Sequence, residues 1–232
     1  MRVGIMQPYF FPYVGYFQLI AAVDKFIVYD NIKYTKKGWI NRNRMLLNGS
    51  DVMFSLPLKN DSDALNICER EISSNFDSNN ILNQFRGAYQ QAPYFKPTFL
   101  LLEEIIRNKE INLFKYLYSS IVKTCEYLGI QTRILVSSEI EINHDLKGQD
   151  KVLALCEAVG ASSYLNAFGG INLYEKEVFQ RKDIDLRFIK SLQFEYPQLG
   201  NSFIPWLSII DVLMFNELDG IASVVSGGYE FL

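Results

Sequence analysis

Three groups of polar and aromatic residues could form a ligand site, and each group follows a predicted strand or precedes a predicted helix. The first group, Gln7, Tyr9 and Tyr13, lies in MQPYFFPYVGY, residues 6 to 16. A side-chain amide at a strand end offers two hydrogen-bond donors and one acceptor, and tyrosine rings can stack on a flat or sugar-like ligand. The alternative is that the two prolines only shape a loop, and that the aromatic rings of this loop pack in the protein core. Four nearby rings are expected mostly to pack: Phe10, Phe11, Tyr16 and Phe17.

The second group combines a carboxylate, cations, amides and a tryptophan: Asp30, Lys37, Trp39, Asn41, Arg42 and Asn43. Asp30 ends a predicted strand, so in a parallel sheet its carboxylate should lie at the same edge as Gln7. Cations can bind phosphate, amides can bind hydroxyls, and a planar ring can stack on a base or sugar. The stretch KKGWINRN therefore suits a nucleotide-sugar or phosphorylated ligand. A solvated basic loop is the alternative.

The third group lies in YLNAFGGINLY, residues 164 to 174, and contains Asn166, Gly169, Gly170 and Tyr174. A strand that ends in two glycines lets backbone N–H groups approach a ligand closely, and Tyr174 adds a hydroxyl near a helix start. A plain two-glycine turn is the alternative.

Asp211 lies in SIIDVLMF, on a helix that is otherwise apolar. A carboxylate in such surroundings must be paired or functional. Arg42 and Arg44 are the candidate partners.

Several common kinds of site are poorly supported. The chain lacks G-x-G-x-x-G after a strand, G-x-x-x-x-G-K-[ST] and G-x-S-x-G, which disfavours the usual phosphate loops and the serine-hydrolase elbow. His144 is the single histidine, so a histidine-based metal site is excluded, and a surface-loop position is expected for it. Cys68, Cys125 and Cys156 are far apart, odd in number and without C-x-x-C spacing. Neither a disulfide framework nor a zinc site is indicated, and no metal or cofactor is expected.

The elements that must position these residues alternate between strand and helix at both ends of the chain. Predicted strands cover residues 2–6, 25–29, 45–47, 52–56, 133–136, 164–167 and 186–189, with a weaker candidate at 69–73. Predicted helices cover residues 14–23, 81–91, 99–108, 113–128, 150–159, 175–180 and 209–216. The fold class is therefore α/β: a mixed, partly parallel sheet with flanking helices and a helical middle segment at about 78–128, in a single domain of residues 1–232.

The composition and net charge limit the kinds of binding partner that are expected. Hydrophobic residues make up 49% and charged residues 21% of the 232, as in a globular protein with a substantial core. A net charge of −3 gives no electrostatic case for binding nucleic acid or an anionic membrane. The N-terminus does not resemble a signal peptide, and no window is apolar enough to span a bilayer, so a cytoplasmic location is expected.

Five segments in order along the chain resemble the WbqC-like protein family: MQPYFFPYVGYFQLI, FIVYDNIKYTKKGWINRNRM, APYF, YLNAFGGINLYEKEVF and LSIIDVLMFN. They span nearly the whole chain. The family is associated with bacterial O-antigen, lipopolysaccharide and related surface-polysaccharide biosynthesis. Its members are described as glycine or aminoacyl transferases acting on amino sugars. The resemblance thus implies a nucleotide-linked amino sugar as substrate.

The implied reaction is amide formation, in which a sugar amine attacks an activated aminoacyl carbonyl. The donor would be a thioester on a carrier protein or coenzyme A, or an adenylate. Such a reaction needs a base and hydrogen-bond donors for the oxyanion. We expect Asp30 to be the base, and Gln7 with the N–H groups near Gly169 and Gly170 to bind the oxyanion. The expected ligand contacts are Lys37 and Arg42 to diphosphate, Trp39 to the base or sugar, and Asn41 and Tyr174 to hydroxyls.

Two alternatives remain. Cys68 could carry the aminoacyl group as a thioester with His144 as base. Alternatively, the protein binds a nucleotide-sugar, or acts as a scaffold of the polysaccharide pathway, without catalysing a reaction.

Overall fold

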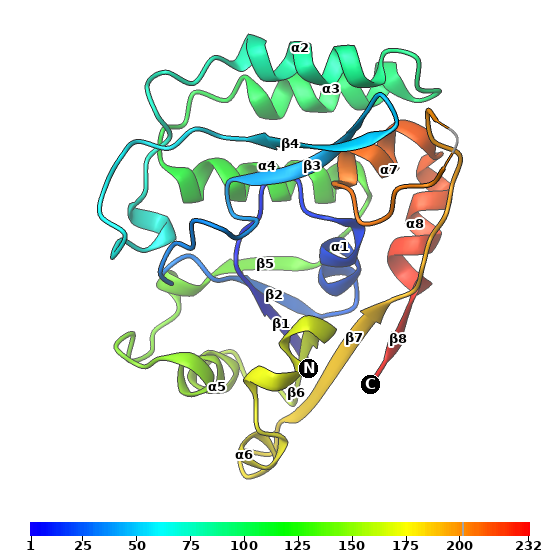
Figure 1. The fold of residues 1–232 in the computed structure, drawn as a ribbon. Coiled ribbons are helices and arrows are strands. Elements are labelled where there is room, and N and C mark those ends of the chain that lie inside the picture. The colour runs from blue at the N-terminus through cyan, green and yellow to red at the C-terminus, as the bar shows by residue number, and fades with distance from the viewer. Residues whose placement is uncertain (201) are drawn as a thin grey trace.

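The computed structural model describes residues 1–200 and 202–232 and has an α/β architecture (Figure 1). The strands are β1 (Arg2–Met6), β2 (Lys25–Val28), β3 (Arg42–Leu47), β4 (Ser50–Ser55), β5 (Arg133–Val136), β6 (Ser163–Ala167), β7 (Asp185–Ser191) and β8 (Tyr229–Phe231). The α-helices are α1 (Val14–Ala21), α2 (Ser78–Tyr89), α3 (Phe95–Ile106), α4 (Leu113–Tyr127), α5 (Gly148–Ala158), α6 (Lys176–Gln180), α7 (Ile209–Phe215) and α8 (Leu218–Gly227). Short 3₁₀ helices span Ile67–Glu69, Ser137–Glu139 and Phe168–Leu173.

The main sheet has six strands in the order β5-β2-β1-β6-β7-β8, parallel except for the antiparallel pair β7–β8. The expected mixed, partly parallel sheet with flanking helices is confirmed. From β1 the chain moves through α1 to β2 on one side, whereas β6 lies on the other side of β1. The gap between the carboxyl ends of β1 and β6 is therefore a topological switch point, where open α/β sheets usually bind ligands.

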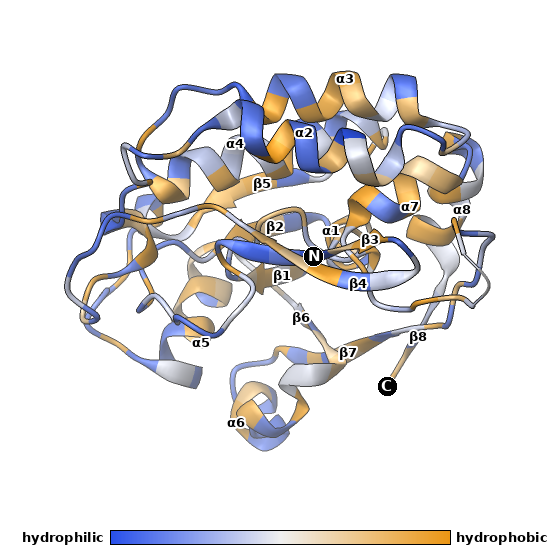
Figure 2. Cartoon of the chain, turned by 45° about the horizontal axis from the view of Figure 1, so that its top comes forward, coloured by the Kyte–Doolittle hydropathy of each residue, from blue (hydrophilic) through white to orange (hydrophobic). Residues whose placement is uncertain are grey.

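Each face of the sheet has its own core. The core on one face includes residues of α1 to α4, α7, α8 and the β3–β4 hairpin, and the core on the other face includes residues of α5 and α6, which Figure 1 shows below the sheet. Alternate residues of β2 divide between the two cores, since Phe26 and Val28 belong to the first and Ile27 to the second. The outer helices α2 and α3 carry both apolar and hydrophilic residues (Figure 2), which suits elements with one buried face. No helix within the described residues combines the length and the apolar character needed to cross a bilayer.

The second sheet is the β3–β4 hairpin, which lies between the main sheet and helices α2 and α3 (Figure 1). Its turn uses Asn48 and Gly49, whose φ angles are 52° and 73°. Two successive residues with positive φ form the hairpin turn whose twist matches that of the strands, and Asn-Gly favours it. The predicted hairpin is thus confirmed, but its first strand begins earlier, at Arg42, among the polar residues of the second group, where no strand was predicted.

The predicted secondary structure differs from the observed one in two other places. Residues 69–73 do not form a regular strand, because only Glu71 and Ile72 make isolated bridges there. The last fifteen residues, for which no element was predicted, contain α8 and the edge strand β8.

Candidate functional site

A cavity of about 570 Å³ lies at the switch point, at the carboxyl ends of β1, β6 and β7 and beside the N-terminus of α1. The β3 strand and the segment before α7 complete its walls. This volume is within the range of small-molecule sites. Its lining residues are Met6, Tyr9, Pro12, Tyr13, Gly15, Tyr16, Leu19, Trp39, Asn43, Arg44, Ala167, Phe168, Gly169, Ile189, Lys190, Ser191 and Trp206.

The loop after β1 is held in a fixed shape by side chains from distant elements. Phe11 has a φ of 44°, an unusual value for a bulky residue. Its carbonyl accepts hydrogen bonds from the Asn43 side chain at 2.8 Å and from the Ser208 hydroxyl at 2.8 Å. Asn43 also donates to the Phe10 carbonyl at 3.1 Å. These bonds compensate the strained turn and fix the two tyrosines on either side of it.

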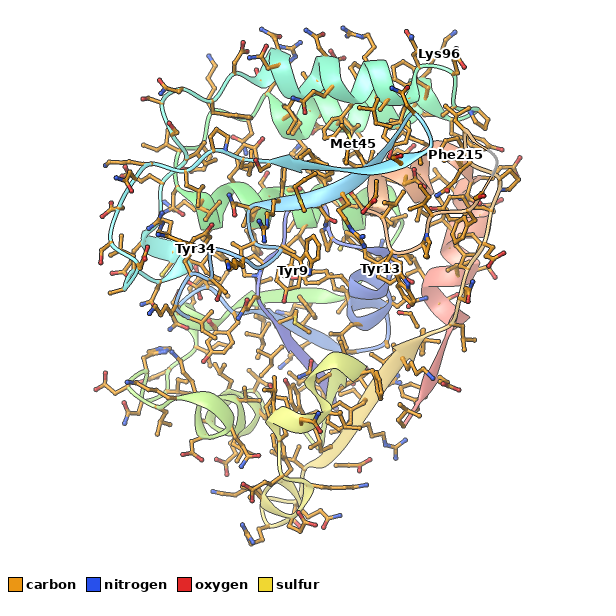
Figure 3. All side chains as sticks on the ribbon, viewed as in Figure 1. Tyr9, Tyr13, Tyr34, Met45, Lys96 and Phe215 are labelled. Atoms are coloured by element: carbon orange, nitrogen blue, oxygen red, sulfur yellow. The ribbon has the colours of Figure 1, made fainter. Side chains whose placement is uncertain are left out.

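Aromatic rings form most of the cavity wall. Tyr13 packs edge-on against Trp206, with ring centroids 5.1 Å apart. Tyr9 and Tyr13 occupy the space between the hairpin and the main sheet (Figure 3). Trp39 and Trp206 are 41% and 50% exposed, so both tryptophans of the chain lie at the cavity mouth. The mouth therefore offers flat apolar surfaces for stacking.

Two cations line the cavity, and each is paired. The Arg44 guanidinium lies 2.9 Å from the Asp51 carboxylate and donates to the Trp206 carbonyl at 3.2 Å. Lys190 is 3.1 Å from the Glu230 carboxylate. Both pairs are partly exposed, so water screens them and a bound anion could compete for the cations.

The described lining residues include no carboxylate, histidine or cysteine. The ionisable hydroxyls of the cavity are tyrosines, and burial raises the pKa of Tyr9 and of Tyr13 above 10.0. Both therefore remain protonated at neutral pH and can donate hydrogen bonds. The cavity can thus bind, orient and desolvate a ligand, but it does not contain a conventional base.

Gly15 allows α1 to approach β7 closely. A Cβ at this position would lie 2.5 Å from the Ser191 hydroxyl oxygen. That hydroxyl donates to the buried Gln18 side chain at 2.6 Å, and the Gln18 amide donates to two carbonyls near the end of α8, at Val224 and Gly228. The floor of the cavity is thereby tied to the C-terminal helix.

The structure gathers residues from all three sequence groups around this cavity: Tyr9, Tyr13, Trp39, Asn43 and Gly169. The other predicted site residues lie outside its lining: Gln7, Asp30, Lys37, Asn41, Arg42, Asn166, Gly170 and Tyr174. Gln7 follows Met6, a lining residue, and its carbonyl accepts a bond from the Tyr16 hydroxyl at 3.0 Å.

Asp30 follows β2, beside the end of β1, and is 2% exposed. Its carboxylate accepts bonds from the Ser137 hydroxyl at 2.7 Å and from the backbone N–H and hydroxyl of Ser138 at 2.9 and 2.6 Å. These bonds connect the ends of β2 and β5. Nearby, the buried Lys151 ammonium donates to the Asn31 carbonyl at 3.2 Å, and burial lowers its pKa.

The remaining predicted residues outside the cavity mostly make contacts within the protein. Asn41 accepts from the Tyr34 hydroxyl and donates to a backbone carbonyl, both at 2.8 Å. Arg42 donates to the Gly38 carbonyl at 3.0 Å. The Tyr174 hydroxyl accepts from the Tyr164 hydroxyl at 3.1 Å in the second core.

The two glycines of the third group differ in their surroundings. A Cβ on Gly170 would lie 2.8 Å from the Asn166 amide nitrogen, whereas a Cβ on Gly169 would meet nothing within 4 Å. Gly170 thus accommodates the Asn166 side chain, and Gly169 lines the cavity. The segment from Phe168 is a 3₁₀ helix rather than a simple turn.

The expected partners of Asp211 were wrong. Its fully buried carboxylate accepts from the Tyr89 hydroxyl at 3.0 Å, the Tyr196 hydroxyl at 2.7 Å and the Gln198 amide at 2.6 Å. Arg44 pairs with Asp51 instead. Burial raises the Asp211 pKa above its usual value, although the three donors oppose this shift.

The described surroundings of Cys68 do not activate its thiol. Burial and the neighbouring Asp30 raise its pKa to about 11, whereas nucleophilic cysteines need a lowered pKa. The His144 ring is 2.9 Å from the Asn31 amide. This geometry argues against a covalent thioester route. Within residues 1–200 and 202–232, His, Cys, Asp and Glu side chains do not gather in groups of three that could hold a metal ion.

Sequence reasoning missed several lining residues: Arg44, Phe168, Lys190, Ser191 and Trp206. Phe168 and Arg44 adjoin predicted site residues, so extending the motifs by one position would have found them. Lys190 and Ser191 end a predicted strand, which is itself a usable signal. Trp206 carries no local signal, because the chain brings it back to the β1 loop from far along the sequence.

The fold and the cavity define an α/β protein with a small-molecule-sized, aromatic cavity at the switch point of its sheet. The sequence matches the profile of the WbqC-like protein family over residues 7–223, and the chain belongs to that family. It is also similar to the uncharacterized protein Rv1507c of Mycobacterium tuberculosis, with 29% identity over 219 residues, which cover 93% of each chain. No solved structure matches.

Proposed function

We propose that the protein binds a nucleotide-linked amino sugar in the switch-point cavity and transfers an aminoacyl group, glycine or a similar one, to the sugar amine. One observation carries the proposal: residues from three separate sequence motifs line a single aromatic cavity at the sheet edge where α/β proteins bind ligands. Family membership supports the same substrate class. The product would belong to surface-polysaccharide biosynthesis, including O-antigen and lipopolysaccharide.

In the reaction, the neutral amine attacks the carbonyl carbon of a thioester or adenylate donor. The N–C bond forms, the bond from carbon to the leaving group breaks, and a proton passes from nitrogen to the leaving group or to solvent. Burial among aromatic rings disfavours the ammonium form, so the cavity itself lowers the pKa of the amine. Tyr9 and Tyr13, which remain protonated, can donate hydrogen bonds to the substrate or to the developing oxyanion.

The proposal assigns the diphosphate to Arg44 and Lys190, the cations that line the cavity. Trp39 and Trp206 provide stacking surfaces for the base or sugar. Lys37 and Arg42 remain proposed as outer contacts for phosphate. Asp30 and Gln7 also remain proposed catalytic groups, although Asp30 lies outside the lining and its carboxylate is already hydrogen bonded.

The test of binding uses thymidine diphosphate 4-amino-4,6-dideoxyglucose and isothermal titration calorimetry. Trp39→Ala should weaken binding by about 5- to 150-fold, since stacking on an aromatic side chain contributes about 1–3 kcal/mol. Phe231→Ala is the matched control, because Phe231 is similarly exposed, at 46%, but lies outside the cavity. Equal affinities for both variants would exclude stacking of the ligand on Trp39.

The test of transfer is mass spectrometry of the same amino sugar after incubation with glycyl thioester and glycyl adenylate donors. A product heavier by one glycyl group supports the transferase. Asp30→Asn then distinguishes the two ways of deprotonating the amine. Loss of transfer with unchanged sugar binding would assign the base to Asp30, whereas full activity would leave desolvation in the cavity as the cause.

A second function, binding of the nucleotide-sugar without chemistry, is favoured by a specific observation. No described lining residue is a carboxylate, histidine or cysteine. Tight binding with no product across the donors would establish this reading. In either case we propose a cytoplasmic location, which the three free cysteines support. The donor partner would be a carrier protein or coenzyme A thioester.

A further inference from the structure

We propose that Asp211 is a positioning residue that holds Trp206 in place at the mouth of the cavity. Asp211 does not line the cavity. It lies in the first turn of α7 and is fully buried. Its three hydrogen-bond donors come from α2 and from the segment between β7 and α7. The inference deepens the proposed function, since it concerns a wall of the same cavity.

The first link runs along the segment that carries Trp206. One oxygen of Asp211 accepts from both the Tyr196 hydroxyl and the Gln198 amide, at 2.7 and 2.6 Å. The same Gln198 side chain bonds both backbone groups of Ile204: it donates to the carbonyl at 3.1 Å and accepts from the N–H at 2.8 Å. Ile204 is two residues before Trp206. Asp211 thus fixes the segment on the N-terminal side of the tryptophan.

The second link reaches the opposite wall through the hairpin. The other oxygen of Asp211 accepts from the Tyr89 hydroxyl at 3.0 Å, and this hydroxyl accepts from the Leu46 backbone N–H at 2.9 Å. Leu46 lies on β3, two residues after Arg44, whose guanidinium donates to the Trp206 carbonyl at 3.2 Å. The Asp211 carboxylate is therefore linked by hydrogen bonds to the segment before Trp206 and to strand β3, which carries Arg44.

Trp206 needs such support because its backbone is strained. Its φ is 61°, in the left-handed region that bulky residues rarely adopt, and such strain persists only where the surroundings enforce it. The conformation places the indole edge-on against Tyr13, with centroids 5.1 Å apart. We expect the residue to relax away from Tyr13 when the bonds to Asp211 are removed.

The two tryptophans provide a direct assay that requires no ligand. Trp39→Phe leaves Trp206 as the single tryptophan, and Trp206→Phe leaves Trp39. In the first background, Asp211→Asn and Tyr196→Phe should each increase acrylamide quenching of Trp206 by about 1.5-fold and lower its emission anisotropy. Tyr196→Phe removes a single donor, so it tests the idea even if Asp211→Asn fails to fold.

The matched control is Tyr94→Phe. Tyr94 also donates its hydroxyl to a carboxylate, that of Glu217, at 2.9 Å, but it has no bond to Asp211. This variant should leave Trp206 unchanged. In the second background, Trp39 should respond less than Trp206 to both test variants. Unchanged quenching of Trp206, or an equal increase at both tryptophans, would overturn the proposal, because the second result means general loosening.

A ligand-binding experiment connects the inference to the proposed function. Tyr196→Phe should weaken binding of thymidine diphosphate 4-amino-4,6-dideoxyglucose about fivefold, as expected for the indirect loss of about one hydrogen bond. If the wild type does not bind this ligand, the proposed function fails while the fluorescence result stands. If the wild type binds and Tyr196→Phe binds equally well, the positioning role fails while the proposed function stands.

Discussion

Replacing Asn43 with alanine tests how the cavity is built. Asn43 is 5% exposed and makes three hydrogen bonds with its side chain. It donates to the carbonyls of Phe10 and Phe11 and accepts from the Arg44 backbone N–H at 2.8 Å. The substitution therefore removes partners from the strained loop that carries Tyr9 and Tyr13.

The magnitude follows from which groups lose their partner. The Phe11 carbonyl keeps its bond from the Ser208 hydroxyl, so the main losses are at the Phe10 carbonyl and the Arg44 N–H. Each buried polar group left unpaired costs about 1–3 kcal/mol, and we expect a total loss of about 3 kcal/mol. For a chain of this size, that loss lowers the midpoint of thermal unfolding by about 6–12 °C.

The assay is urea unfolding of the wild type and Asn43→Ala, with Asn41→Ala as the matched control. Asn41 is an asparagine on the same segment, partly buried, with bonds to Tyr34 and Leu56 rather than to the β1 loop. Asn43→Ala should also weaken ligand binding. A loss of less than about 1 kcal/mol for Asn43→Ala would contradict the view that this side chain maintains the strained loop.

Three further predictions concern single positions. Gly15→Ala should destabilise the fold by about 1–3 kcal/mol because its Cβ would meet the Ser191 hydroxyl at 2.5 Å. Gly87→Ala in α2, where a Cβ meets nothing within 4 Å, should instead stabilise by up to about 1 kcal/mol; urea unfolding of both variants decides. Burial raises the Asp211 pKa above its unfolded value, so the ionised carboxylate costs stability at neutral pH. The thermal midpoint of the wild type should therefore rise relative to Asp211→Asn as pH falls from about 7 towards about 4, and the opposite trend would refute this. With a pKa of about 11, Cys68 should react with iodoacetamide at pH 8 on the order of 100-fold more slowly than a free thiol. Rapid labelling, or loss of transfer in Cys68→Ala, would revive the thioester route.

The sequence was sufficient for those elements whose signals are local. The apolar runs of β1 and β2 and the helix between them predicted a parallel unit, and the structure pairs Val3 with Lys25 and Met6 with Val28 in that way. The Asn48-Gly49 turn predicted the hairpin because those residues adopt positive φ at little cost.

Local sequence patterns did not predict the secondary structure of segments that long-range contacts determine. Arg42 and Asn43 were predicted to belong to a ligand-binding group, with a solvated loop as the alternative, and no strand was predicted for them. Asn43 is instead buried on β3, where its amide donates to two carbonyls of the β1 loop. In α8, Gly220 and Gly227 weaken the helical pattern, and the packing of Ile221 and Val225 in the core compensates.

The candidate site was only partly accessible to sequence reasoning, for the same reason. Tyr9, Tyr13, Trp39 and Gly169 follow or adjoin predicted elements, and they do line one cavity. Trp206 comes from a connection whose path depends on bonds between Gln198, Ile204 and Asp211. Periodicity says nothing about such long-range contacts. The roles proposed for Asp30 and Gln7 stay predictions.

The most direct test of the central claim is a crystal structure of the protein with thymidine diphosphate 4-amino-4,6-dideoxyglucose. We predict density for the ligand in the switch-point cavity, with rings stacked on Trp39 or Trp206 and the diphosphate beside Arg44 and Lys190. Ligand bound outside this cavity, or an empty cavity at a concentration where calorimetry shows binding, would contradict the account.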